Sequence, residues 1–435
     1  MYQIENKIKK FNILLIYLLP ISLIFSTFLS NFIFIFISIT FLIFNFKKKI
    51  NIPNWILYFL VFGIYLIFNP ANFLNLNENT SQVDHILKII FFLRFPIFFL
   101  AVTLWIIEDK KKFTHILILS IISISFVSID IIYQYYFNFD IFGFEAGGYN
   151  EQLNIYYRHS GPFGEELIGG SFLYKSIIIC LSAKFFFNNN SHPGIFYVLT
   201  ILVMLTLLAT FFSGERVSAF KILMLSLIFY FFYFKTVKKK LIFIFLIILL
   251  PFTIFTVNDD LKNRYINQTK KEIGSLNNLL ANSNHFKHYK SAYIIFKNNK
   301  IFGTGTRSFR YECEKVFFNV GDPKKQELIP LNRAAPPRIA TQNKGCITHP
   351  HNYLFEIASD AGIIGIVLFM MFAFSFAVYF FKKNKLILLY GFIFYFPFLP
   401  SGSFYASWDN MMFWFTLSIL FMFKNYYNEN AREHS

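Results

Sequence analysis

The sequence predicts an all-α fold, a polytopic bundle of transmembrane helices with one large, partly helical loop. The first observation is composition: of 435 residues, 55% are hydrophobic and only 15% charged, and the mean hydropathy is +0.49. A soluble domain carries about 25% charged residues, and disordered or collagen-like chains lack this much apolar surface. The second observation is that apolar runs of about twenty residues, long enough to cross a bilayer, recur along the chain. The third is that Lys clusters separate alternate runs.

Twelve apolar runs are expected to cross the bilayer. The first two are nearly continuous and would also suit one long tilted helix, but Pro20, Ser30 and Asn31 favour a reversal. The expected spans are 11–28, 31–46, 54–69, 86–107, 113–137, 167–187, 194–212, 217–234, 241–257, 352–380, 386–400 and 408–424.

The net charge of +17, from 41 Lys+Arg against 24 Asp+Glu, is expected to orient this bundle. Basic residues collect in the cytoplasmic loops of membrane proteins. With twelve spans, every Lys cluster that flanks a span falls on one face, so both termini are predicted to be cytoplasmic. Most of the charge excess is then explained without a nucleic-acid partner. The clusters are Lys7, Lys9 and Lys10, Lys47–Lys49, Lys110–Lys112, Lys238–Lys240, and Lys382, Lys383 and Lys385.

The opposite face is predicted to carry the longer connections, above all the segment 258–350. This loop of about 90 residues contains a helical pattern at 284–298 and is too polar to span. Loops beyond about fifteen residues are usually functional or disordered, and the aromatic content here argues against disorder. We expect one integral membrane domain, 1–435, with this loop inserted between the ninth and tenth spans. The chain shows no repeat of 20–50 residues, and its first span is predicted to be a signal anchor because no small-residue cleavage site follows it.

The cysteines agree with this orientation. Cys180 lies in a span, whereas Cys313 and Cys346 lie in the large loop, on the side expected to be oxidising. A disulfide between the loop cysteines is expected, and closing a loop of this size would contribute about 3–4 kcal/mol. Two free thiols are the alternative, and half of a metal site is less plausible.

Arg216 is the first candidate functional residue. It follows Ser213, Gly214 and Glu215 in a turn on the outer face and begins a span. A cation at a helix N-terminus opposes the helix dipole, and the outer face disfavours positive charge. An anion that binds both the helix N–H groups and the guanidinium resolves this conflict, and a diphosphate fits. The alternative is an interfacial Arg that pairs with Glu215 and contacts lipid headgroups.

A second candidate group, Thr348-His349-Pro350-His351-Asn352, opens the tenth span. Asn352, Glu356 and Asp360 recur every four residues, so they form a polar stripe on one helix face, and Gly362 and Gly365 allow close packing. A His beside such a stripe can act as general base on a sugar hydroxyl. The alternative is a His that reaches the headgroup region.

Two further stretches carry weaker signals. The segment Gly303-Thr304-Gly305-Thr306-Arg307-Ser308-Phe309-Arg310, preceded by His285 and His288, is a possible phosphate-binding loop, although paired glycines recur by chance. Arg158 and His159 precede the sixth span on the same face. Within the spans, charged side chains are expensive in hydrocarbon and are candidates by default; they are Arg94, Asp130, Lys175 and Lys221, and Gln134 lies one turn from Asp130.

Several chemistries find no matching pattern in the sequence. No Cys/His spacing matches a zinc site, and no Walker loop or Asp-x-Asp pair is present. We therefore expect no cofactor and no metal.

These motifs together resemble the O-antigen ligase-like family of bacterial membrane glycosyltransferases, which also includes polysaccharide polymerases. The resemblance rests on the 213–216 turn, the large late loop, Gly303-Thr304-Gly305, and His351-Asn352 followed by Glu356 and two glycines, and it covers about 125–380. The Thr348–Asn352 motif with paired loop cysteines is similar to an alphaproteobacterial subgroup.

The resemblance implies transfer of a glycan from undecaprenyl diphosphate, on the periplasmic face of the inner membrane, to lipid A core or another glycan. It implies that Arg216 binds the diphosphate and that His351 is the catalytic base, with substrate-binding roles expected for Arg158, His285, Arg307, Arg310, His349, Asn352 and Glu356. One departure is that His285 stands where the family commonly has a second essential Arg; Arg264, Arg307 and Arg310 are the candidates to supply the missing charge. Ligase and polymerase remain open, and a polysaccharide transporter or flippase is a further alternative, although transporters are commonly built from repeated halves.

Overall fold

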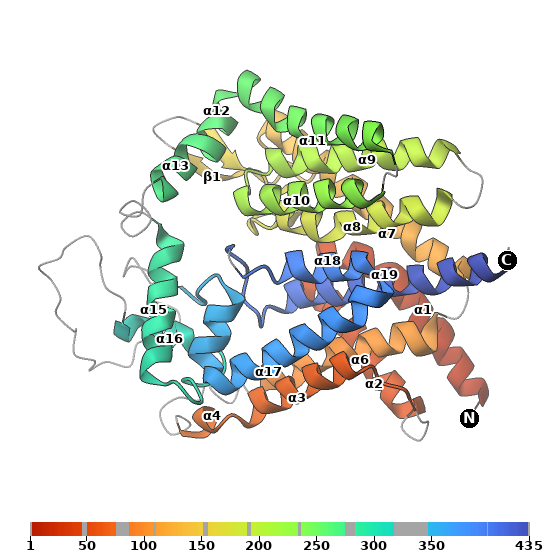
Figure 1. Cartoon of the computed structure of the whole chain (residues 1–435), viewed down its shortest axis with the longest axis vertical. Coiled ribbons are helices and arrows are strands. Elements are labelled where there is room, and N and C mark those ends of the chain that lie inside the picture. The colour runs from red at the N-terminus through yellow and green to blue at the C-terminus, as the bar shows by residue number, and fades with distance from the viewer. Residues whose placement is uncertain are drawn as a thin grey trace, which may run out of the picture.

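The computed structural model describes residues 2–45, 50–74, 87–107, 110–150, 155–188, 193–233, 236–274, 283–316, 347–397 and 399–433. Its long helices lie side by side, and both chain termini lie at the same end of the bundle (Figure 1). The bundle helices are α1 (Tyr2–Phe25), α2 (Thr27–Asn45), α3 (Asn54–Phe68), α6 (Arg94–Ala101), α7 (Lys110–Phe137), α8 (Gly169–Asn188), α9 (Pro193–Phe212), α10 (Arg216–Tyr233), α11 (Val237–Val257), α17 (Tyr353–Lys383), α18 (Lys385–Phe394) and α19 (Ser407–Glu433).

The opposite end carries the short elements (Figure 1). A small antiparallel hairpin, which the all-α prediction did not include, lies in the connection between α7 and α8. The large loop contains a helix at the predicted range 284–298. These elements are α4 (Pro70–Leu74), β1 (Gly147–Asn150), β2 (Ile155–Arg158), α12 (Asp259–Lys262), α13 (Gln268–Ile273), α15 (Asn284–Asn298) and α16 (Phe309–Val316), with single 3-10 or π turns at Phe91–Leu93, Val102–Ile106, Gly161–Phe163 and Asn263–Asn267.

Helices suited to a membrane dominate the part of the chain that the structure describes. Seven are long and apolar enough to cross a bilayer, and three shorter apolar helices accompany them. The chain is therefore a polytopic membrane protein, as predicted. Each of the twelve expected ranges contains a helix. The eleventh is shorter than expected, because α18 ends at Phe394 and the predicted span ends at residue 400.

The first two helices form a hairpin rather than one long helix. Asn12 Nδ2 donates to Thr40 Oγ1 at 3.0 Å, and Ser30 Oγ donates to Ser22 Oγ at 2.9 Å, so the two helices run antiparallel. The reversal itself is confirmed, but it falls at Ser26, and Pro20 lies inside α1.

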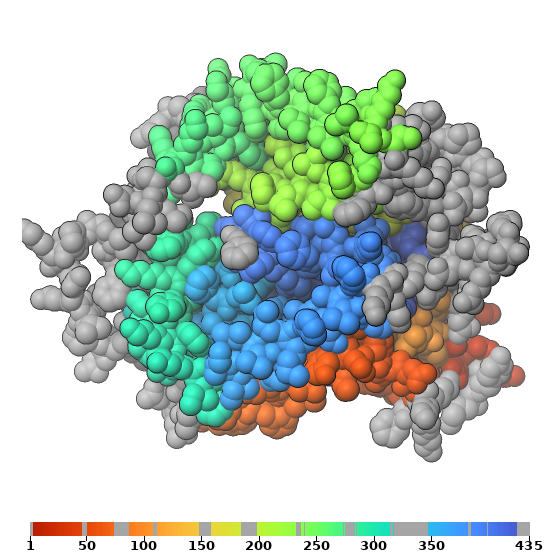
Figure 2. All heavy atoms as spheres, in the orientation of Figure 1, coloured from red at the N-terminus to blue at the C-terminus, as the bar shows by residue number. Residues whose placement is uncertain are grey.

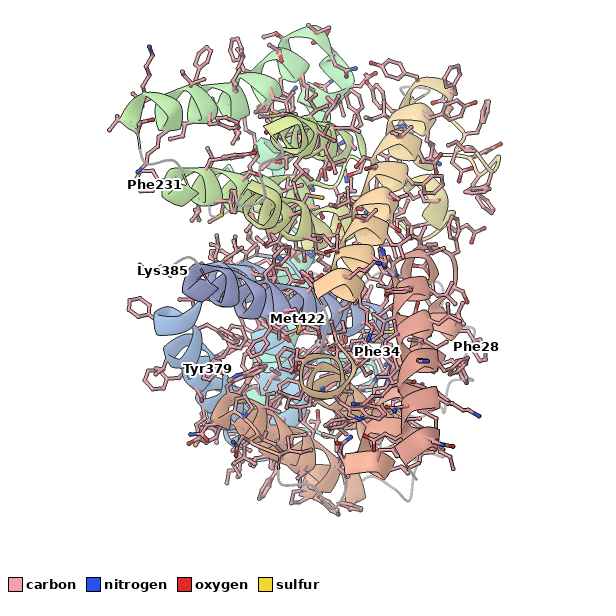
Figure 3. The ribbon with its side chains drawn as sticks, turned by 90° about the vertical axis from the view of Figure 1, so that its right-hand side faces the viewer. Phe28, Phe34, Phe231, Tyr379, Lys385 and Met422 are labelled. Carbon is pink, nitrogen blue, oxygen red and sulfur yellow. The ribbon has the colours of Figure 1, made fainter. Side chains whose placement is uncertain are left out.

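Two groups of helices build the bundle. α7 to α11 form one, and α1, α2, α3, α6 and α17 form the other, with α19 packed against both α8 and α6. Along the boundary, the yellow-green surface of α10 lies directly against the blue surface of the C-terminal segments (Figure 2). Viewed from the end with the termini, Phe34 points into the bundle and Phe28 points away from it (Figure 3), and Phe28 is 82% exposed in the chain alone. Apolar side chains thus fill the interior and also cover the outside, as a lipid-facing bundle requires.

Helix α17 is broken at Gly362, in its N-terminal part, and this break places the large loop. Gly362 has a φ of +63°, and a Cβ there would lie 2.2 Å from the Ile301 carbonyl oxygen. The break frees backbone carbonyls, which find new donors: Tyr65 Oη donates to Ala361 O at 2.8 Å, and Asn69 Nδ2 to Asp360 O at 3.3 Å. Irregular backbone within a membrane protein is tolerated when its polar groups are satisfied in this way.

Candidate functional site

His351 lies in a constrained turn directly before α17. Its φ of +54° is unusual for a residue with a side chain. Asn352 caps the helix that follows, because its side-chain oxygen accepts from Leu354 N at 3.0 Å and Phe355 N at 3.2 Å. The loop thus ends and the helix starts within two residues, which presents the imidazole at the N-terminal end of α17.

One hydrogen bond sets the tautomer of His351. Its Nδ1 lies 3.3 Å from the carbonyl oxygen of Ser401, and Ser401 N donates back to His351 O at 2.8 Å. A carbonyl oxygen only accepts, so Nδ1 is assigned the proton and Nε2 keeps its lone pair. Nε2 is the atom that a general base uses.

Three other imidazoles surround His351. The ring centroids of His349, His285 and His288 lie 4.4, 5.0 and 6.1 Å from that of His351. Burial lowers the pKa of His285 and of His288 to about 4, and of His349 to about 3, and a charge on His351 lowers each of them further. Burial also lowers the pKa of His351, although its bond to Ser401 opposes the shift. All four rings are therefore neutral at neutral pH.

Arg216 begins α10 and pairs with the large loop. Its Nη2 donates to both carboxylate oxygens of Glu272, at 2.9 and 3.0 Å, and its Nη1 donates to Thr269 Oγ1 at 3.2 Å. The alternative of a pair with Glu215 is wrong, since Glu215 instead accepts from Gly170 N at 2.9 Å and Ser218 Oγ at 2.8 Å. The Arg216 side chain is 23% exposed, so a ligand can reach it.

His285 joins the Arg216 pair to the imidazole cluster. The pKa of His285 is lowered by burial, by His351 and by Arg216, and raised by Glu272. The charges of the ion pair and of His351 therefore both reach His285. That the expected catalytic base and the expected diphosphate ligand share one site stays a prediction.

The Gly303–Gly305 turn is not a phosphate-binding loop, and this corrects the sequence interpretation. Thr304 N donates to Ser359 O and Gly305 N to Asp360 O, both at 3.0 Å. Asp360 also accepts from Arg307 N at 2.7 Å and Phe309 N at 3.2 Å. The amide groups that would cradle a phosphate are thus used to dock the turn on the break in α17.

The guanidinium groups that follow this turn remain candidates for binding an anion. The Nε atoms of Arg307 and Arg310 are buried without a hydrogen-bond partner among the described residues. Both cations lower the pKa of His349, so they lie on the side of the imidazole cluster. Burial and the neighbouring Arg310 also lower the pKa of Arg307.

Asn352 and Glu356 hold the segment that orients His351. Asn352 Nδ2 donates to Pro397 O at 2.6 Å. Glu356 accepts from Ser403 Oγ and Phe404 N, both at 2.6 Å. Ser401 lies between these anchor points, so both side chains act on His351 through the backbone, and a direct contact with substrate stays a prediction.

Arg158 and His159, which precede the sixth span, both bond backbone carbonyl groups. Arg158 Nη2 donates to Leu167 O at 2.9 Å, and His159 Nδ1 bonds Phe212 O at 2.8 Å. Burial lowers the pKa of His159 to about 4, which makes it a neutral core residue. A substrate-binding role for Arg158 stays a prediction.

Most of the charged residues expected in the spans have structural partners. Arg94 donates to Asn31 Oδ1 at 2.5 Å and to Ser407 Oγ at 3.2 Å, and Asp130 accepts from Ile141 N at 2.9 Å. Lys175 pairs with Asp409, a residue that the sequence analysis missed although a carboxylate at the start of a span was visible. Lys221 is the exception among these residues.

The cysteine prediction is met as far as the structure describes it. Cys313 is buried and disulfide-bonded, and Cys180 is free and buried. Cys346 lies outside the described residues, as do Lys47–Lys49 of the expected cytoplasmic clusters. Among the described residues, no group of three or more His, Cys, Asp or Glu is arranged to hold a metal ion.

One family of known proteins is similar to part of this chain. Residues 201–370 match the model of a family described as O-antigen ligase. The matched segment runs from α9 into α17 and contains the turn at Arg216, the large loop and His351. Residues 201–370 are therefore similar to the O-antigen ligase domain, whose family members are membrane glycosyltransferase-like enzymes that act on lipid-linked glycans. No curated protein matches the chain.

Proposed function

We propose that this protein transfers a glycan from undecaprenyl diphosphate to a sugar acceptor, as an O-antigen ligase does. The observation that carries the proposal is His351, whose Nδ1 bonds Ser401 O and whose neighbours His285 and His349 feel the charges of Arg216 and of Arg307 and Arg310. A base next to a group of cations suits a reaction in which a hydroxyl loses a proton while a diphosphate gains negative charge.

The reaction follows from this arrangement. Nε2 of His351 takes the proton of the acceptor hydroxyl as its oxygen attacks the anomeric carbon of the donor. The bond from that carbon to the diphosphate oxygen breaks, and lipid diphosphate leaves with the electron pair. Arg216, Arg307 and Arg310 stabilise the charge that builds on it, with bidentate geometry available to each. We propose that these guanidinium groups make a metal ion unnecessary, and that His349 and His285 line the donor site.

We propose a topology of twelve spans with both termini in the cytoplasm and the site facing the periplasm of the inner membrane. The location of both termini at one end of the bundle supports an even number of spans (Figure 1). The Lys clusters at that end support a cytoplasmic location. The loop 258–350 would then cover the donor from the periplasm and exclude water. Single cysteines introduced at Lys7 and at Lys297, probed in intact cells with a thiol reagent that does not cross membranes, test this: only the second should react.

A polymerase that adds the glycan to another lipid-linked glycan would use the same site, because O-antigen ligases and polymerases share this domain. Deletion of the gene separates the two. Loss of a ligase strands long chains on the lipid carrier, whereas loss of a polymerase leaves single repeat units on the core.

Complementation of the deletion strain tests the mechanism. His351→Ala and Arg216→Ala should each abolish surface-glycan assembly, while Lys297→Ala, an exposed cation on the same loop, should restore it. Membrane insertion of each variant is checked by immunoblotting of membrane fractions. Full assembly by both the His351 and the Arg216 variant would refute the mechanism.

A further inference from the structure

Lys221 is a buried cation that the proposed chemistry leaves unused. It lies in α10 five residues after Arg216, and only 2% of its surface is exposed. Its ammonium lies 5.1 Å from the ring centroid of Tyr174 on α8. Among the described residues it forms no hydrogen bond and no ion pair.

The neighbouring Lys175, in contrast, has polar partners. Lys175 donates to Ser171 Oγ at 2.9 Å and pairs with Asp409. Both ammonium groups pack on Tyr174, at 5.4 Å for Lys175. Two lysines thus share one carboxylate, and the second positive charge is left without a counterion. A charge within a membrane bundle is expensive unless an opposite charge accompanies it.

The depth of Lys221 fits the geometry of a lipid diphosphate. With a rise of about 1.5 Å per residue, Lys221 lies about 7–8 Å deeper along α10 than Arg216. In a lipid-linked donor the hydrocarbon chain enters the membrane first, so the phosphate attached to the lipid is the deeper one. The phosphate attached to the sugar then lies toward Arg216 and His351.

An apolar groove lies farther along the same helix. Its lining combines three side chains of α10 with two of α11, and none is polar: Leu227, Ile228, Phe231, Ile244 and Ile248. Going inward, α10 thus presents Arg216, then Lys221, then an apolar surface, which is the order of charge and hydrocarbon in the donor.

We propose that Lys221 binds the lipid-attached phosphate of the donor, with the hydrocarbon chain in the groove between α10 and α11. α10 borders the C-terminal segments along the boundary between the helix groups, where the two surfaces face each other (Figure 2). This inference rests on the proposed function for the identity of the donor. It adds a second phosphate contact, and it divides the two phosphates between two residues.

Binding of two lipids tests whether the two phosphates are bound by different residues. The full-length protein in nanodiscs is titrated with undecaprenyl phosphate, which has only the lipid-attached phosphate, and with undecaprenyl diphosphate. Lys221→Met should weaken the affinity for each lipid by about ten-fold or more, since it removes one charged hydrogen bond from each complex. Lys221→Arg should retain most of the affinity for both.

Arg216→Ala is the matched comparison. It should weaken the binding of undecaprenyl diphosphate much more than that of undecaprenyl phosphate. If Lys221→Met binds both lipids as tightly as the unaltered protein, the inference is overturned; if only Arg216→Ala has no effect, the proposed role of Arg216 fails and the Lys221 contact stands. Met suits the apolar surroundings, and Lys221→Gln provides a second test with the same expected loss should Lys221→Met not fold.

Discussion

A single backbone contact prepares His351 for its proposed role. The Ser401 carbonyl fixes the proton on Nδ1, and burial keeps the ring neutral. The three surrounding imidazoles have pKa values lowered further by a charge on His351, so His351 accepts the first proton when the pH falls. His351 is therefore the most basic ring of the cluster, as a general base should be.

The pH dependence of transfer should report this arrangement. The pKa of His351 lies below the usual value of about 6.5. Activity should therefore persist below pH 6.5 and fall as His351 gains its proton. Stability should also fall as the pH drops from about 6.5 toward 4, because the unfolded chain binds protons that the folded histidines do not. A pH–rate profile and melting temperatures across this window check both, and an acid limb above pH 7 would contradict the assignment.

The ion pair between Arg216 and Glu272 predicts competition between the loop and the donor. Glu272 occupies the guanidinium that we assign to the diphosphate. Glu272→Gln should lower the donor KM up to about five-fold, since a partly exposed ion pair contributes about 0–1 kcal/mol. Steady-state kinetics measure this, with Glu312→Gln on the same loop as control. An increase in KM would show that Glu272 helps to bind the donor instead.

At the scale of elements, the break in α17 couples the large loop to the bundle. Gly303 and Gly362 approach so closely that a Cβ at Gly362 would lie 2.7 Å from Gly303 N. Asn69 Nδ2 adds a third element by donating to Phe302 O at 2.8 Å. The turn and the helix break therefore form one unit that sets where the loop leaves the membrane surface.

Gly362→Ala should disrupt this unit. The substitution combines a left-handed backbone with a Cβ 2.2 Å from Ile301 O, and strain of this kind is worth about 1–3 kcal/mol or more. Melting temperature in detergent and transfer activity should both fall. Gly63→Ala in α3 is the control, because its Cβ would meet only the terminal methyl of Leu93. Equal melting temperatures for the two variants would contradict the docking role.

The sequence predicted the helices better than the contacts between them. Apolar runs located the spans and a helical pattern located the helix at 284–298, while charge placement singled out Arg216 and the polar stripe after Asn352 singled out His351. The paired glycines suggested a phosphate loop because glycine allows a ligand to approach the backbone closely. The acceptors at Ser359 and Asp360 lie over fifty residues later, so only the folded chain reveals that the turn is a docking element.

For the whole molecule, buried polar contacts join the two helix groups. Lys175 of α8 pairs with Asp409 of α19, and the aromatic ring of Trp408 lies 4.8 Å from the ammonium. A Cβ on Gly402 would overlap Asp409, so this pair also lies beside the segment that orients His351. Lys175 and Asp409 are far apart in the sequence, and their pairing was not predicted.

A double-mutant cycle should show that this pair specifies the arrangement more than it stabilises it. Lys175→Met alone leaves Asp409 buried and unpaired, which should cost about 3–5 kcal/mol and lower the melting temperature. Lys175→Met combined with Asp409→Leu removes both charges and should recover most of that loss, because apolar replacement of a buried ion pair is often neutral or stabilising. If the double variant is as unstable as the sum of the two single variants, the charges are not coupled. Recovery of stability without recovery of transfer would show that the pair sets the position of the segment behind His351.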